Sequence, residues 1–175
     1  MMKTINHRRN NKGAMIIFTC FLIGIIALPM IGMSTFEVVR ATTLREQLRT
    51  ASQAAALAGA AKLASSDNTD PIKTHNEAIQ AALEAFRANA ISEFSLTAAT
   101  KAGSINYAPP ADQAGVYIEL LDPNSTPPNK SVSIGDTNGR IVHVVGLFGL
   151  KPVFGNFLGI TGPFTVRADG SGRVP

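Results

Sequence analysis

The sequence predicts an α+β fold: a transmembrane helix that continues into a long outer helix, a second short helix, and a small, mostly antiparallel sheet. Three observations predict it. Residues 14–36 carry no charged side chain. An Ala-rich helical pattern follows them to about residue 64, with no proline to interrupt it. Beyond residue 94, apolar side chains mostly alternate with polar ones, which is the period of a β-strand.

Length and charge limit the classes of protein that the chain can represent. The 175 residues allow one domain with a short appendage. Four of the 16 basic side chains lie in the first twelve residues, where no acidic one occurs. The rest of the chain is neutral, with 12 basic and 12 acidic residues. It lacks the basic face of a nucleic-acid binder, so we expect no nucleic-acid partner.

The segment 14–36 is long enough to cross a membrane. Its 23 residues form a helix of about 35 Å, against a hydrocarbon core of about 30 Å. The basic residues that precede it favour a cytoplasmic N-terminus. We therefore predict a basic cytoplasmic head over 1–13, a transmembrane helix over 14–36 and an outer domain over 37–175.

Three alternatives to a single span are weaker. A cleaved signal peptide has an apolar core of about 7–15 residues, whereas this run continues past Pro29 with no clear small-x-small site. A lipoprotein would be modified at Cys20, but the residues before it do not form a convincing lipobox. Residues 141–166 are apolar enough to suggest a second span, yet Lys151 and five glycines interrupt them.

One face of the predicted outer helix is apolar and small. Its members fall at helical spacing and form a candidate contact face: Leu44, Leu48, Ala51, Ala55 and Ala58. Small side chains let another backbone approach closely. The face would pack either on a partner protein or on the protein's own sheet, and the sequence leaves both possibilities open.

A second amphipathic helix is predicted over about 74–90, opened by Thr74 and Glu77 as a capping box. Alternation then predicts five short strands, with Asn138-Gly139 as a hairpin turn between the third and the fourth. The strands are expected at residues 94–96, 116–120, 132–134, 141–145 and 164–168. Loops rich in proline, glycine and polar residues are expected over 101–114 and 122–130.

The sequence carries no recognisable catalytic or metal-binding motif. His7, His75 and His143 lie far apart, and Cys20 lies in the predicted span, so no metal-ligand spacing is present. No serine has nucleophile-elbow surroundings, and no Gly-rich phosphate loop opens a helix. We therefore expect no enzyme activity, no cofactor, no metal and no small-molecule substrate.

Several short motifs follow one another in a fixed order along the chain. They are Arg8-Arg9, Gly13-Ala14, Glu37 to Arg40, Ala51 to Ala58, and Phe154 to Ile160 followed by Phe164 to Ala168. Their order and spacing resemble those of the TadE/TadG-like proteins of Flp (tight adherence) pilus assembly. The resemblance is good over about residues 8–64 and weaker over 140–175.

This resemblance implies a pilin-like or pseudopilin-like protein of the bacterial inner membrane, with residues 37–175 in the periplasm. It implies a structural or assembly role in a Tad/Flp-type pilus, through contacts with the membrane and with pilins or other assembly proteins. The alternative function is a membrane-tethered periplasmic binding or sensor module.

One departure from the family concerns processing of the N-terminus. Gly13-Ala14 resembles a prepilin peptidase site, but the minor pilins of the family carry a glutamate where this sequence has Phe18. The pattern resembles that of TadG-type members, in which cleavage is not expected. Longer TadG-like proteins also carry a von Willebrand A-type domain, whose D-x-S-x-S motif does not occur in this sequence.

Overall fold

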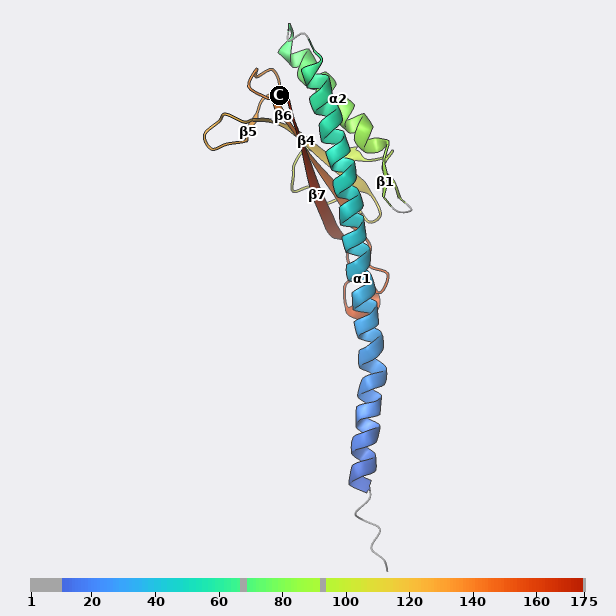
Figure 1. Cartoon of the computed structure of the whole chain (residues 1–175). Helices are drawn as coiled ribbons and strands as arrows, with labels where there is room; N and C mark the ends of the chain where they lie inside the picture. The colour runs from blue at the N-terminus through green and yellow to red at the C-terminus, as the bar shows by residue number, and fades with distance from the viewer. Residues whose placement is uncertain (1–10, 67–68, 92–93, 175) are drawn as a thin grey trace, which may run out of the picture.

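The computed structural model describes residues 11–66, 69–91 and 94–174. A single helix, α1 (Asn11–Ala64), includes the predicted span and the predicted outer helix (Figure 1). Its 54 residues correspond to about 80 Å of rod. The prediction of one uninterrupted helix is confirmed, and Pro29 lies inside it. The helix begins three residues earlier than the predicted span, and residues 1–10 of the basic head lie outside the described residues.

The second helix, α2 (Pro71–Arg87), starts and ends earlier than the sequence suggested. The predicted capping box is wrong, because the N-cap is Asp70, whose carboxylate accepts the N–H groups of Ile72 and Lys73 at 3.1 Å. A proline at the first helical position is already shaped for a helix start, so the Asp-Pro pair determines the boundary. The carboxylate of Glu77 instead pairs with Lys62 at 3.0 Å.

The strands form one main sheet and one short hairpin. They are β1 (Ala90–Ile91), β2 (Phe94–Ser95), β3 (Thr100–Lys101), β4 (Ala114–Asp122), β5 (Lys130–Val132), β6 (Ile141–Leu150) and β7 (Phe164–Arg173). In the main sheet the order is β3-β4-β6-β7, and β5 pairs with β4. β4, β6 and β7 are antiparallel to one another, and β3 runs parallel to β4. The short helix α3 (Gly155–Leu158) lies between β6 and β7.

The predicted hairpin at Asn138-Gly139 is wrong, because β5 pairs with β4 and not with β6. The N–H of Gly139 does bond the carbonyl of Asp136, so a turn forms there. The connection is, however, directed towards α2, since the N–H of Gly135 donates to His75 Nδ1 at 3.0 Å. Gly135 also has a φ of +98°, a conformation that favours glycine.

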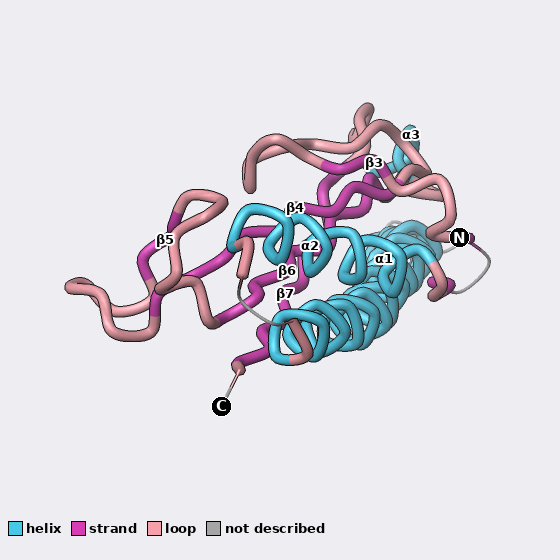
Figure 2. Tube along the Cα trace, turned by 90° about the horizontal axis from the view of Figure 1, so that it is seen from above, coloured by secondary structure: helices cyan, strands magenta, loops and turns pink. Residues whose placement is uncertain are grey.

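Both helices cover the same face of the sheet, where the main core lies (Figure 2). Apolar side chains from all layers meet there, including Leu48 and Ala55 on α1, Phe86 on α2, Val116 on β4 and Val144 on β6. A small second cluster of Ala102, Val145 and Leu147 lies apart from this core. The predicted α+β class is therefore confirmed. The second half of α1 contributes side chains to the core between the helices and the sheet.

Candidate functional site

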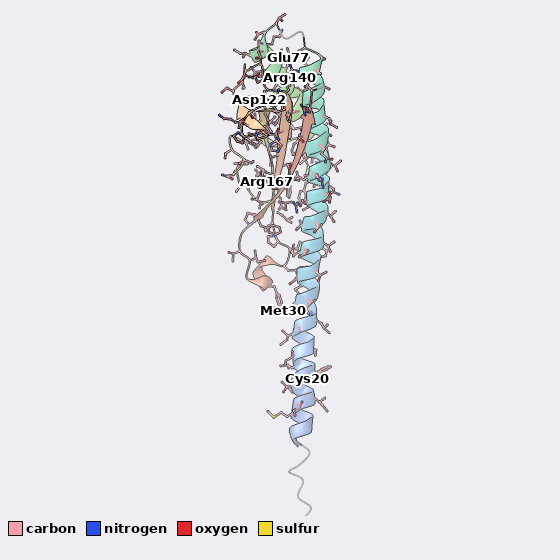
Figure 3. All side chains as sticks on the ribbon, turned by 60° about the vertical axis from the view of Figure 1, so that its left-hand side comes forward. Cys20, Met30, Glu77, Asp122, Arg140 and Arg167 are labelled. Atoms are coloured by element: carbon pink, nitrogen blue, oxygen red, sulfur yellow. The ribbon has the colours of Figure 1, made fainter. Side chains whose placement is uncertain are left out.

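The first half of α1 is covered by no other part of the described protein. Its large apolar side chains, from Met15 to Ile31, are exposed. Figure 3 shows this bare part of the rod between Cys20 and Met30. Among the described residues, α1 is the one helix that is long and apolar enough to cross a membrane. Its length, composition and exposure fit a membrane anchor.

The residues of the possible peptidase site lie on the first turns of this bare helix. Gly13, Ala14 and Phe18 are all exposed. Phe18 follows Ala14 by four residues, so the two side chains lie on the same side of α1, about one turn apart. No acidic residue occurs in the sequence before Glu37. The part of α1 before Glu37 therefore offers no carboxylate near this site.

Where the apolar part of α1 ends, three residues within about one and a half turns hold the segment that joins β6 to β7. Glu37 is only 7% exposed, and its Oε1 accepts the N–H of Phe154 at 2.8 Å. Arg40 Nη1 donates to the carbonyl of Lys151 at 2.8 Å. The rings of Phe36 and Phe154 meet edge to face at 5.8 Å. We call Phe36, Glu37 and Arg40 the clasp.

Sequence reasoning missed the clasp. Glu37 and Arg40 were recognised only as markers of the end of the span. Their partners lie more than 100 residues away along the chain, at Lys151 and Phe154. These contacts form only in the folded protein, so the sequence does not indicate them. An acidic residue directly after an apolar run indicates only the end of the span.

The candidate contact face on α1 is mostly inside the protein. Leu44, Leu48, Ala51 and Ala55 are buried in the core that α1 forms with α2 and the sheet. Ala58 is half-buried and does not belong to that core. The sequence left open whether this face packs on a partner or on the protein's own sheet. The first four residues pack inside the protein, whereas Ala58 remains partly accessible.

A polar cluster lies across β4 and β6. Glu119 Oε1 is 2.9 Å from His143 Nδ1, and the Tyr117 hydroxyl donates to Glu119 Oε2 at 3.2 Å. Burial raises the pKa of Tyr117, and the neighbouring Glu119 raises it further. Both carboxylate oxygens of Glu119 thus have a partner within the cluster. In residues 11–66, 69–91 and 94–174, no group of three or more His, Cys, Asp or Glu residues is placed to hold a metal ion.

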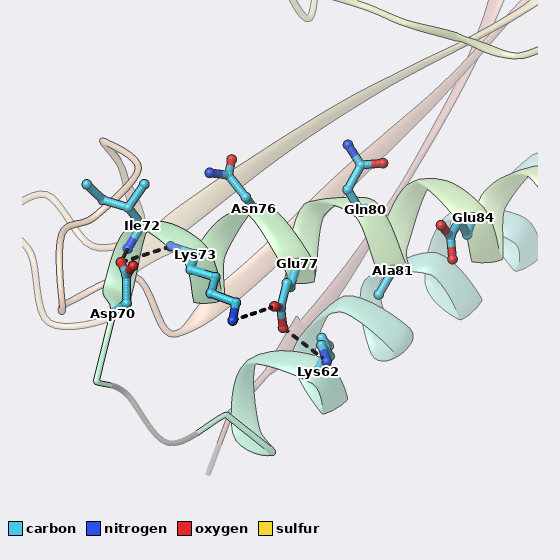
Figure 4. Close-up of a pocket in the computed structure, with 9 residues that line it drawn as sticks. All are labelled: Lys62, Asp70, Ile72, Lys73, Asn76, Glu77, Gln80, Ala81 and Glu84. Carbon is cyan, nitrogen blue, oxygen red and sulfur yellow. Dashed lines mark hydrogen bonds and ion pairs between the residues drawn. The ribbon is translucent and has the colours of Figure 1, made fainter.

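A shallow depression lies between the end of α1 and α2 (Figure 4). Its polar side chains contact one another: Lys62 and Lys73 approach Glu77 at 3.0 and 4.0 Å. Asp70, which also lines the depression, caps α2. Only the Lys62–Glu77 pair joins α1 to α2, and exposed ion pairs of this kind contribute about 0–1 kcal/mol each.

His75 makes the stability of the domain depend on pH. Burial lowers the pKa of His75, and Asp136 opposes this only in part. A proton on Nδ1 would also remove the acceptor for the Gly135 N–H. Below pH 6.5 the unfolded chain binds the proton more readily than the folded one, so stability falls as the pH drops from 6.5 to the folded-state pKa. Above pH 6.5 this contribution is fully present.

Unfolding of the full chain in detergent at about pH 7.5 and pH 5.5 checks this prediction. The variant His75→Asn keeps an oxygen acceptor but cannot titrate, so we expect a smaller loss of stability between the two pH values. Equal losses in the two proteins would mean that His75 does not contribute.

The geometry defines a class: an α+β protein built on the continuation of its own apolar anchor helix. Comparison with protein families makes this more specific. Residues 13–62 match the family model described as putative Flp pilus-assembly TadE/G-like. The resemblance to TadE/TadG-like proteins is thereby confirmed over nearly all of α1, while α2 and the sheet lie outside the match. Comparison with curated proteins and with solved structures found no match.

Proposed function

We propose that this chain is a membrane-anchored structural or assembly component of a Tad/Flp-type pilus that acts by protein–protein contacts, without catalysis. The observation that carries the proposal is the family match over residues 13–62. It coincides with the exposed apolar half of α1 and with most of the half that carries the outer domain. The match supports pilus assembly, and the exposed apolar helix supports anchoring in the membrane.

The proposed topology has one span, a cytoplasmic N-terminus and a periplasmic domain over residues 37–175. Lys3, Arg8, Arg9 and Lys12 support this orientation, because basic residues beside a span are retained in the cytoplasm. The strands β6 and β7 support a single span, since residues 141–150 and 164–166 of the second apolar stretch pair within the sheet. A reporter fused after Pro175 is expected to report the periplasm.

The partner contact is proposed on the part of α1 that the outer domain leaves uncovered. Ala54, Leu57 and Ala61 are exposed there, and Ala58 is half-buried beside them. Leu57 is the large apolar side chain of this surface and is 62% exposed. Small neighbours around a single large apolar side chain allow a second helix to approach closely.

We expect the N-terminus to remain uncleaved. The reason is Phe18, which occupies the position where a processed prepilin carries glutamate. Intact-mass measurement of the protein from membranes should give the full chain. A mature N-terminus at Ala14 would contradict this prediction and favour a minor pilin, whereas a start near Thr35 would indicate a cleaved signal peptide.

Deletion of the gene tests the proposed function itself. We expect loss of Flp pili from the cell surface, restored by the full chain, and the protein in the inner-membrane fraction. Its presence in purified pili would keep the pilus function but place the chain in the fibre. Normal pili in the deletion strain would reject the proposal and favour the membrane-tethered binding or sensor module.

A further inference from the structure

The segment 151–163, which we call the β6–β7 connection, exposes large apolar side chains beside the anchor helix. Val153 is 58% exposed, Phe157 61% and Ile160 44%. Figure 1 shows this connection extending from the sheet along α1 towards the bare half of the rod. In Figure 3, α3 lies beside α1 on the outer-domain side of the labelled Met30.

The connection is a folded structure with a fixed position. The clasp holds its first part through the Phe154 N–H and the Lys151 carbonyl. Its second part folds back, since the N–H of Ile160 donates to the carbonyl of Gly155 at 2.8 Å. A Cβ on Gly155 would lie 2.5 Å from the Ile160 carbonyl oxygen, so this turn requires glycine. The exposed apolar side chains are therefore presented at a fixed height on α1.

That height corresponds to the surface of a bilayer. Phe36, which contacts Phe154, is the last residue of the uncharged run, and Glu37 is the first charged one. The 23-residue run measures about 35 Å as a helix, which exceeds the hydrocarbon core by about 5 Å. A run of this length, centred in the core, brings Phe36 to the outer edge of the hydrocarbon, and the connection lies beside it.

The charge of the connection suits the same environment. Lys151 is its only charged residue, and no acidic residue occurs between positions 151 and 163. Lysine beside exposed phenylalanine and isoleucine is typical of segments that lie at a membrane interface, with apolar groups about 5–10 Å deep. Anionic lipid headgroups would attract Lys151.

We propose that the β6–β7 connection is a second membrane contact, which inserts Val153, Phe157 and Ile160 into the outer surface of the bilayer that α1 spans. The inference rests on the membrane anchoring in the proposed function. Together with the clasp, it fixes the angle at which the outer domain stands on the membrane. A helix alone leaves its domain free to tilt, whereas two contacts restrict tilt and present the outer face of α1 in one direction.

Lipid quenching in the full chain tests this contact. In a Cys20→Ser background, an environment-sensitive fluorophore is attached at Phe157→Cys or Ile160→Cys, each exposed in the structure. The chain is reconstituted in vesicles of phosphatidylethanolamine and phosphatidylglycerol that contain a nitroxide-labelled lipid. Ile23→Cys in the apolar run and the exposed Thr137→Cys, on the turn between β5 and β6, serve as references.

We expect several-fold stronger quenching by the labelled lipid at 157 and 160 than at 137, together with reduced access for aqueous iodide. Values equal to those at 137 would overturn the proposal. Shielding from both iodide and labelled lipid would overturn it as well, because protein would then cover the connection. Loss of lipid quenching at 23 would instead overturn the anchoring on which the inference rests.

Discussion

Replacement of Gly170 by alanine is expected to lower the free energy of unfolding of the outer domain by about 3 kcal/mol. β7 passes α1 so closely at this point that a Cβ would lie 2.5 Å from the Gln53 nitrogen and 2.6 Å from its Cα. These are backbone atoms of a helix, which cannot turn aside as a side chain would. α1 would have to move away from β7.

That movement would also disturb a buried hydrogen-bonded contact. Ser52 is fully buried, and its hydroxyl donates to the Ala168 carbonyl at 3.3 Å and accepts the Gly146 N–H at 3.1 Å. The hydroxyl thereby joins α1 to β6 and β7. A buried polar group that loses its partner costs about 1–3 kcal/mol, so the clash and the broken contact act in the same direction.

Chemical unfolding of the full chain in detergent measures this effect. Gly103→Ala is the matched control, because Gly103 is exposed and a Cβ there would meet nothing within 4 Å. We expect the control to change stability by no more than about 0.5 kcal/mol. Equal stabilities for the two variants would show that α1 and β7 are less closely packed than the structure indicates.

The helices were predictable from local sequence, and the strand pairing was not. Residues 37–64 contain many alanines and no proline, so propensity alone indicates a helix there. The Asn138-Gly139 signal was real as a turn, but whether a turn joins paired strands depends on the remaining edges of the sheet. β6 pairs with β4 and β7 along its two edges, so β5 does not pair with β6 and pairs instead with the other edge of β4.

The candidate contact face shows the same limit in one helix. Its spacing identified an apolar stripe correctly, but the face that is buried widens towards the end of α1. Gly59 there lies against Ala78 and Ala82 of α2, while Ala56 lies against β7. Ala58 therefore lies at the edge of the buried face of α1. Helical spacing along α1 alone does not indicate this position.

This difference between Ala55 and Ala58 gives a test of the partner contact. Ala55→Leu places extra methylene groups in a filled core and is expected to destabilise the domain by about 1–3 kcal/mol. Ala58→Leu adds the same groups at the rim, beside Ala54, Leu57 and Ala61. We expect it to leave unfolding within about 0.5 kcal/mol of the original protein.

If a partner packs on this outer face of α1, the same leucine should weaken that contact by about 1–3 kcal/mol, or about 5- to 150-fold in affinity. Pilus number and co-purification of assembly proteins should then fall in Ala58→Leu, although its unfolding is unchanged. A drop in stability would assign Ala58 to the core after all. Unchanged stability with normal pili would reject the outer face, and the loops at 101–114 and 122–130 would be the next surfaces to test.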